Sequence, residues 1–321
     1  MGNYIKKRTI TGVLTIVFSF CLTFFLTRCA PGNPVKVLAG ADNPNPELIE
    51  HLTIRYGLDK SLPVQFVNYV KDVFKGDLGY SYISNRPVTT LIAEKIFPTI
   101  LLSLTATLLS VVIGTILGIY AARRAGSILD RVMCGISYVF DSLPGFWLGL
   151  ILILIFASGL GLLPTSGMYD VREDYEGLPK VLDIMRHMIL PVSALLIIQT
   201  PAYFRVARSS VIQTMSEDFV LTLRATGMSE NKIFNKYILR NAIIPTVTIF
   251  SSDLAFMVGG VTFVEIVFAW PGMGRLIMEA ITRRDYPLLT GIYLMISISI
   301  CIVMLITDIV YAFIDPRIRL R

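Results

Sequence analysis

The chain has 321 residues, of which 54% are hydrophobic and only 16% charged, and its mean hydropathy is +0.66. An average soluble domain has about 25% charged residues, and a soluble core of this size could not bury so much apolar surface, so the composition predicts a membrane protein. The net charge is +6, and the basic residues lie in short clusters between apolar runs. These clusters lack the interleaved aromatic residues of a nucleic-acid-binding protein.

Six apolar stretches are near the roughly 20 residues that an α-helix needs to cross about 30 Å of hydrocarbon. They are residues 9–27, 96–122, 142–169, 188–204, 242–268 and 286–307, and the end of the third is expected to be loop. The sequence thus predicts an all-α membrane protein with six transmembrane helices.

The Lys and Arg residues between these stretches predict the orientation, because short cytoplasmic loops are enriched in them. They concentrate before the first stretch, between the second and third, between the fourth and fifth, and after the sixth. Both termini are therefore predicted to be cytoplasmic. A cleaved signal peptide is an alternative, since Leu26-Thr27-Arg28-Cys29 is similar to a lipoprotein cleavage box. We favour a retained helix because the apolar run exceeds the usual length of about 7–15 residues and Arg28 stands where a small residue is needed.

Between the first two stretches, the pattern predicts a small helical cap outside the membrane. Asn45-Pro46 is a good helix start, with Asn as the N-cap and Pro at the first helical position. Val67, Val70 and Phe74 recur at helical spacing, and Gly76 is a natural stop. This pattern fits a lid that only stabilises the protein as well as one that docks a partner.

The cytoplasmic loop at about 205–241 is the most informative segment. Met215, Phe219 and Leu223 share one helical face, and Gly227 then ends the helix. A second helix is expected over residues 229–239, with Ser229 as its cap. A helix–Gly–helix elbow of this kind can insert into a groove on a cytoplasmic partner.

The elbow resembles the cytoplasmic loop of bacterial ABC importer permeases, in which Glu-Ala-Ala, three residues and Gly precede a Pro that opens the next span. The match centres on Gly227 and on Leu239-Arg240-Asn241-Ala242-Ile243-Ile244-Pro245, while Leu221-Thr222-Leu223 replaces Glu-Ala-Ala. Further motifs narrow the resemblance to dipeptide, oligopeptide and nickel importer permeases. They include Gly57-Leu58-Asp59-Lys60-Ser61-Leu62-Pro63, Gly76-Asp77-Leu78-Gly79-Tyr80-Ser81, Leu143-Pro144-Gly145-Phe146-Trp147, Glu265-Ile266-Val267-Phe268-Ala269-Trp270-Pro271-Gly272-Met273-Gly274 and Arg284-Asp285-Tyr286-Pro287.

This resemblance implies a type I ABC importer permease fold in the bacterial inner membrane, forming half of a translocation pore for peptides. The implied partners are a homologous second permease, two cytoplasmic ABC ATPase subunits and an external substrate-binding protein. ATP and Mg would be bound by the ATPases, because this sequence has no GxxxxGK[ST] phosphate loop. We therefore expect no catalytic residue, bound metal or cofactor in this chain. The ATPase-coupling residues would be Thr222, Arg224, Ala225, Thr226, Gly227, Met228, Ser229, Arg240, Asn241 and Pro245.

The same resemblance implies four parts along the chain. Residues 1–28 would form the cytoplasmic N-terminus and first helix, and 29–95 the external cap. Residues 96–314 would form a five-helix core, and 315–321 a cytoplasmic tail.

Polar residues inside the apolar stretches are candidates for function, because a charge at mid-bilayer costs about 2.5–3.5 kcal/mol on insertion scales. Asp253 lies about 16 Å into the fifth stretch and could line the pore and meet a cationic substrate group. Alternatively, Ser251, Thr248 or a neighbouring helix satisfies it. Glu265 is predicted to form an outer gate or binding-protein dock together with Trp270, Pro271 and Gly272, or else to anchor the end of the span.

Two further acids, Asp141 and Asp308, are expected near the inner surface in structural roles. Within the family, a nickel or metal-chelate permease is the alternative function. An ion-gradient-driven secondary transporter is more distant, because it would have midplane acids but no elbow. A membrane enzyme is disfavoured because the sequence has no metal-ligand cluster, GxSxG motif or facing pair of carboxylates.

Overall fold

The computed structural model describes residues 2–29, 46–55, 57–259 and 261–314. The regular elements of this part are helices, with one isolated β-bridge between Tyr80 and Pro87. The chain divides into two compact units, Met1–Pro98 with Gly272–Arg321, and Thr99–Pro271. The predicted tail 315–321 and the Asn45 cap lie outside the described residues.

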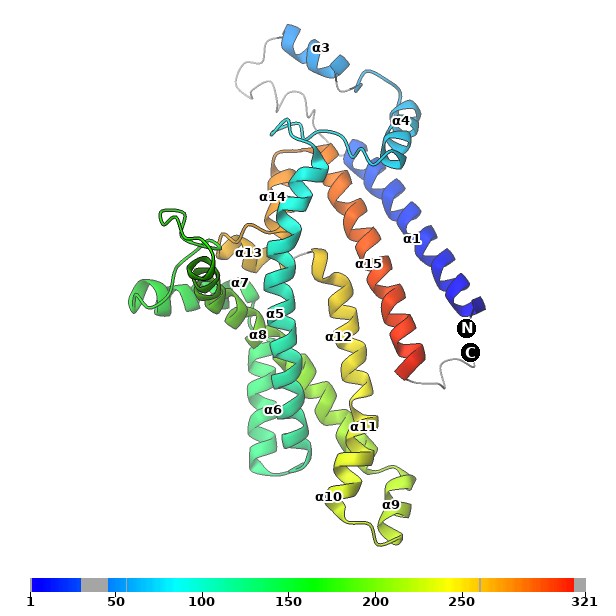
Figure 1. The fold of residues 1–321 in the computed structure, drawn as a ribbon, viewed down its shortest axis with the longest axis vertical. Coiled ribbons are helices and arrows are strands. Elements are labelled where there is room, and N and C mark those ends of the chain that lie inside the picture. Colours follow the sequence, from blue (N-terminus) through cyan, green and yellow to red (C-terminus); the bar gives the residue numbers. More distant parts are fainter. Residues whose placement is uncertain (1, 30–45, 56, 260, 315–321) are drawn as a thin grey trace. The chain divides into compact units, whose positions relative to one another are not determined.

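The first unit contains α1, α3, α4, α14, α15 and the first turns of α5 (Figure 1). Their bounds are Gly2–Cys29, Pro46–Arg55, Leu62–Phe74, Met273–Thr282, Tyr286–Ile314 and Val88–Ala122. α1 packs along α15. The buried core includes Val88, Ile92, Met273 and Ile292. Side chains at positions 64, 67 and 74 of the predicted cap are exposed, although its helices form as expected.

Asp285 fixes the loop that precedes α5 to the start of α15. Its carboxylate accepts hydrogen bonds from the Ser81 hydroxyl and from the backbone N–H of Tyr82 at 3.1 Å. The carboxylate is buried, so these donors replace the water that it loses. Two of the sequence motifs, one around residue 80 and one around residue 285, therefore meet in the same contact.

The second unit contains the rest of α5 and the elements from α6 to α13. These are α6 (Ile128–Asp141), α7 (Gly145–Leu152), a π-helix (Ile153–Gly159), α8 (Leu178–Met215), α9 (Asp218–Ala225), α10 (Glu230–Lys232), a π-helix (Ile233–Ile238), α11 (Leu239–Ala242), α12 (Ile244–Phe256), a 3₁₀ turn (Met257–Gly259) and α13 (Thr262–Val267).

α5 and α8 approach each other closely at two glycines of α5. A Cβ on Gly114 would lie 2.7 Å from the Cβ of Tyr203, and one on Gly118 would lie 2.6 Å from the carbonyl oxygen of Phe204. Small residues allow helix backbones to pack tightly in membranes, where water does not drive association. α5 and α8 are thus in close backbone contact at these two positions.

Five described helices are long and apolar enough to cross a membrane, or six if a bent pair counts as one span. The bent pair is α6 with the α7–π-helix segment, which meet at 96°. The expected third span, 142–169, begins at this bend, and a helix that the prediction did not include precedes it over Ile128–Asp141. The bend falls at Pro144, which has no N–H for a continuing helix.

The expected fifth span, 242–268, also differs. Helical structure continues from Glu230 through α12 and breaks near Gly259, before the short α13. Figure 1 shows α10, α11 and α12 following one another along one path. Pro245 permits this because it sits in the first turn of α12, where its missing N–H removes no helical hydrogen bond. The predicted separate helix over 229–239 is therefore the start of this longer one.

Candidate functional site

The predicted elbow around Gly227 has the sharp turn that the sequence predicts. α9 ends at Ala225, and Gly227 adopts a φ of +76°, the left-handed region in which glycine has no steric penalty. The Gly227 N–H donates to the Arg224 carbonyl at 3.0 Å, and Met228 N–H donates to the Leu223 carbonyl at 3.3 Å. The backbone then extends at Ser229 and α10 begins, so the turn reverses the chain within a few residues.

An ion pair closes the elbow on its exposed side. Arg224 Nε lies 2.6 Å from Glu230 Oε1, and Arg224 Nη2 lies 3.1 Å from Glu230 Oε2. This hydrogen bonding raises the pKa of the Arg224 guanidinium above its already high usual value. Both side chains are exposed to solvent, so the pair orients the two helices more than it stabilises them.

An apolar core attaches the elbow to the ends of the long helices. Val220, Ile233 and Ile238 are buried together with Ala122 of α5 and Val211 of α8. The expected inward residues at 215, 219 and 223 pack against this core. A force applied to the elbow would therefore reach α5 and α8 directly, through packed side chains.

Arg123, in the turn after α5, adds a polar anchor. Its guanidinium carbon lies 3.9 Å from the centre of the Phe234 ring, and Nη2 donates to the Asn235 side-chain oxygen at 2.9 Å. Cation–π contacts and charge-assisted hydrogen bonds of this kind fix orientation. Sequence reasoning used Arg123 only to assign topology and did not predict this contact.

The outer surface of α9 carries an apolar residue that the sequence analysis treated only as a departure from a motif. Leu221 is 68% exposed, opposite the inward-facing Phe219 and Leu223. The neighbouring predicted coupling residues Thr222, Arg224, Ala225 and Thr226 are also exposed. The sequence could have indicated Leu221, because this leucine lies on the face of α9 that does not pack against the core.

The remaining predicted coupling residues lie in two environments. Met228 is half-buried and packs against the elbow core, while Ser229 is exposed. Farther on, Arg240 and Asn241 are exposed, and the Asn241 amide donates to the Tyr237 carbonyl at 3.0 Å. Thr222, Arg224, Ala225, Thr226, Gly227 and Ser229 are thus exposed around the turn, and residues 240–245 lie at the start of α12 and just before it.

Asp253 of α12 has a partner on α8. The buried Tyr203 hydroxyl donates to Asp253 Oδ2. Ser251 and Thr248, the partners considered from the sequence, instead donate to backbone carbonyls of their own helix. Asp253 itself is half-buried, so its second oxygen keeps some access to the space beside α12.

Two arginines of α8 pair with the two acids of α6. Arg208 holds Asp130 with two short contacts, Nε to Oδ1 at 2.6 Å and Nη2 to Oδ2 at 2.7 Å. Arg205 Nη2 lies 3.0 Å from Asp141 Oδ2. Asp130 is buried, whereas the side chain of Asp141 is 44% exposed.

The expected position of Asp141 near the inner surface stays a prediction. Asp141 is the last residue of the 14-residue helix α6, so it lies about 20 Å along that helix from Ile128. Arg205 provides a cationic partner for this acid.

Glu265 and Trp270 lie inside a folded turn. Both side chains are fully buried, and Thr99 Oγ1 donates to Glu265 Oε1 at 2.7 Å. The backbone N–H of Trp270 donates to the backbone carbonyl of Glu265 at 2.8 Å. Neither side chain offers surface to an external protein in this conformation. The gate or docking role of these residues, with Pro271 and Gly272, stays a prediction.

Several described helices can cross a membrane by length and composition, and the elbow is packed against two of them, which is the architecture expected of a multi-pass membrane protein. A solved structure of the MetNI methionine ABC transporter in an inward-facing conformation supports the fold. It aligns with a TM-score of 0.55 at 17% identity, over 70% of this chain and 96% of the solved chain.

Residues 114–320 match the family model described as "Binding-protein-dependent transport system inner membrane component". Residues 1–105 match "Binding-prot-dependent transport system membrane comp, N-term". The chain belongs to this family of binding-protein-dependent inner-membrane transport components. It is a multi-pass permease of the inner membrane, and the family is not one of enzymes.

Curated relatives match over almost their whole length. The probable peptide ABC transporter permease protein y4tP of Sinorhizobium fredii is 35% identical, over 99% of this chain and 100% of the relative. The glutathione transport system permease protein GsiC of Salmonella choleraesuis is 36% identical, over 100% of both chains. The di/tripeptide transport system permease protein DppB of Pseudomonas aeruginosa is 34% identical, over 99% of both.

Proposed function

We propose that this chain forms half of the translocation pore of an ATP-driven importer whose substrates are short peptides. The observation that carries the substrate class is the set of full-length relatives named for peptide, glutathione and di/tripeptide transport. Glutathione is itself a tripeptide, so the three names describe one chemical class. The proposal places a homologous permease beside this chain and an external binding protein above it.

The elbow around Gly227 is proposed to couple the pore to two cytoplasmic ATPases. The exposed Leu221 would insert into a groove on an ATPase subunit, and the exposed Thr222, Ala225 and Thr226 would surround it. ATP would then shift the permease between two states through its different affinity for the open and closed ATPase pair. The buried core beneath α9 would pass this movement to α5 and α8.

Asp253 is proposed to meet the cationic amino terminus of the peptide. Tyr203 occupies one of its oxygens, which orients the carboxylate and leaves the other oxygen to accept from an ammonium group. The charge would favour a zwitterionic peptide over an uncharged solute of the same size.

Uptake by cells that lack the chromosomal copy of this chain tests the proposal. Restoring the chain together with its neighbouring transport genes should restore ATP-dependent uptake of radiolabelled dipeptide and tripeptide. Excess unlabelled peptide should compete, whereas nickel should not. Restoration of nickel uptake alone would contradict the peptide assignment, and uptake driven by an ion gradient without ATPases would contradict the importer class.

A further inference from the structure

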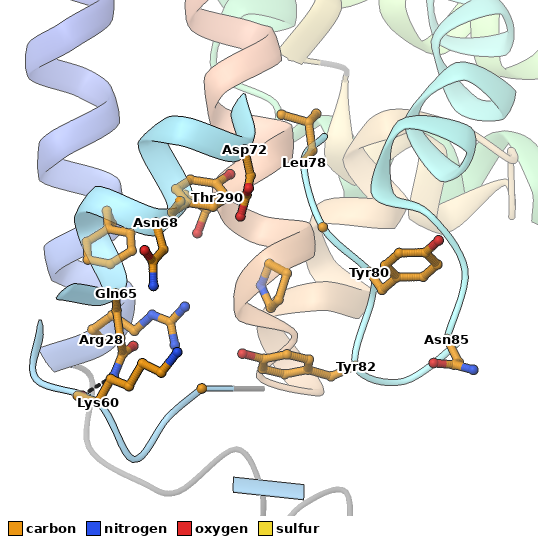
Figure 2. A pocket seen from close by; sticks show the side chains of 15 residues that line it. Arg28, Lys60, Gln65, Asn68, Asp72, Leu78, Tyr80, Tyr82, Asn85 and Thr290 are labelled. Carbon is orange, nitrogen blue, oxygen red and sulfur yellow. Dashed lines mark hydrogen bonds between the residues drawn. The ribbon is translucent and has the colours of Figure 1, made fainter. Parts of the chain in front are cut away.

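The first unit contains a polar cavity that the transport cycle described above does not use. Its volume is about 470 Å³, and it is lined by the end of α1, by α4 and its preceding loop, by the segment before α5 and by the start of α15. Figure 2 shows the long side chains of Arg28 and Lys60 extending into this cavity.

The cavity holds more positive charge than its own residues neutralise. Within the part of the chain that the structure describes, Nε and Nη1 of Arg28 are buried and donate no hydrogen bond, and neither Arg28 nor Lys60 forms an ion pair. Asp72 is the acid among the lining residues. Buried guanidinium N–H groups without acceptors favour an anion that can accept from them.

Other polar groups around the cavity are also without partners among the described residues. The Tyr69 hydroxyl and the Gln65 side-chain oxygen are buried without a hydrogen bond, although the Gln65 amide nitrogen donates to the Lys60 carbonyl at 2.8 Å. A hydroxyl can donate to an anionic oxygen, as a guanidinium does. The cavity therefore offers several donors to one ligand with several acceptor oxygens.

The depth of Arg28 in the membrane points to the source of this anion. Arg8 and Arg28 flank the apolar part of α1, and the rise of an α-helix places them about 30 Å apart, which is the thickness of the hydrocarbon layer. With the N-terminus in the cytoplasm, as the distribution of Lys and Arg predicts, Arg28 would lie where the hydrocarbon of the outer leaflet meets its phosphate groups.

The surfaces next to the cavity are apolar and uncovered. On α1, Leu22, Phe25 and Leu26 are 47%, 42% and 60% exposed, within two turns of Arg28. On α4, Val64 and Val67 are 46% and 49% exposed. A free anion or a peptide carboxylate has no apolar part that could cover these side chains, whereas the acyl chains of a phospholipid can pack against them.

We infer that this cavity binds the phosphate of an outer-leaflet phospholipid through Arg28 and Lys60, with the acyl chains against α1. The guanidinium would donate two hydrogen bonds to phosphate oxygens, and the Lys60 ammonium would add a point charge. The bound lipid would fasten α4 of the external cap to the outer end of the first span. This inference does not depend on which solute the permease carries.

Native mass spectrometry of the detergent-purified transporter tests it, with phosphatidylglycerol as the probe. Arg28→Gln and Lys60→Gln should each lower the bound fraction at limiting lipid by about fivefold or more, because each removes a charge-assisted contact. Lys71→Gln is the matched control, since Lys71 is an exposed cation of α4 that does not line the cavity. It should bind as the unaltered chain does.

Three outcomes would overturn the inference. Equal binding of diacylglycerol with the same acyl chains would show that the phosphate is not recognised. Displacement of the lipid by millimolar inorganic phosphate would assign the cavity to a free anion, and displacement by diglycine would assign it to a peptide carboxylate. If Arg28→Gln lowers the Tm of the protein, its lipid binding is not interpreted and the Lys60→Gln result alone tests the inference. Lys60 is an exposed loop residue, so its substitution should not change the fold.

Discussion

The cytoplasmic elbow and the polar pairs of the long helices are built in opposite ways. The turn of the elbow is built by neighbours in sequence, with a glycine at the turn, an ion pair between Arg224 and Glu230, and apolar residues at helical spacing. The polar pairs join residues far apart in sequence, as in Asp130 with Arg208, Asp253 with Tyr203 and Glu265 with Thr99. The outer face of the elbow is exposed, whereas each of these pairs has at least one buried partner, so that polar groups within apolar helices are satisfied.

The buried pair should give the largest effect. Asp130→Ala leaves the Arg208 guanidinium without its carboxylate, and losing a hydrogen bond to a charged group in a buried site costs about 2–3 kcal/mol. Thermal denaturation of the purified chain should show a clear loss of stability. The double variant Asp130→Ala with Arg208→Leu should recover part of it, since no unpaired charge remains. An unchanged Tm for Asp130→Ala would contradict the structural role of this pair.

Disturbing the contact between α5 and α8 should give the second-largest loss of stability. Gly118→Ala places a Cβ where the Phe204 carbonyl lies 2.6 Å away, so the helices must separate, at a cost of about 2 kcal/mol. Gly135→Ala is the matched control, because no atom lies within 4 Å of its added Cβ. Denaturation should separate the two variants, and equal stability would show that α5 and α8 are not in tight contact.

Substituting Gly227 in the elbow should lower the stability of the protein less than these changes do, but it should clearly lower transport. A β-branched side chain at the left-handed Gly227 costs about 1–2 kcal/mol of backbone strain, while asparagine tolerates this conformation better. Gly227→Val should therefore uncouple peptide uptake from ATP hydrolysis more than Gly227→Asn, at equal membrane abundance. No neighbouring atom lies within 4 Å of the added Cβ, so a steric clash does not confuse the result. Equal uptake by the two variants would argue against a role for the turn geometry.

The smallest effect is expected at Asp253. Asp253→Asn keeps an oxygen that can accept from Tyr203 but removes the charge, so uptake at limiting peptide should fall by about fivefold, or about 1 kcal/mol. The amount of protein in the membrane should not change. Tyr203→Phe is the companion variant, since it frees the carboxylate without removing its charge. Unaltered uptake by Asp253→Asn would exclude a pore role.

The same contrast explains what the sequence could predict. The apolar stretches and the stop at Gly227 follow from local composition and spacing, and the structure has apolar helices in these regions and a left-handed Gly227. The orientation stays a prediction. The bend before Pro144 and the burial of Glu265 and Trp270 could not be predicted, because they depend on helices that pack against each other from distant positions. For the same reason, neither Tyr203 as the partner of Asp253 nor Arg205 as the partner of Asp141 could be predicted.

Leu221 is a second kind of residue whose role the sequence did not predict. Its exposure on α9 follows from helical geometry once the inward face at Phe219 and Leu223 is known. A single exposed leucine is not by itself evidence of a binding surface, so the sequence alone could not assign Leu221 a contact role.

Crosslinking from Leu221 tests the central claim most directly. A Leu221→Cys variant would be made in a chain whose four native cysteines are replaced, with Lys236→Cys as the exposed control on the far arm of the elbow. In membrane vesicles that contain the ATPase subunits, position 221 should crosslink to an ATPase, and the yield should change when ATP is added. Position 236 should crosslink weakly and without a response to ATP. No ATPase crosslink at 221, with transport intact in the same vesicles, would contradict the account.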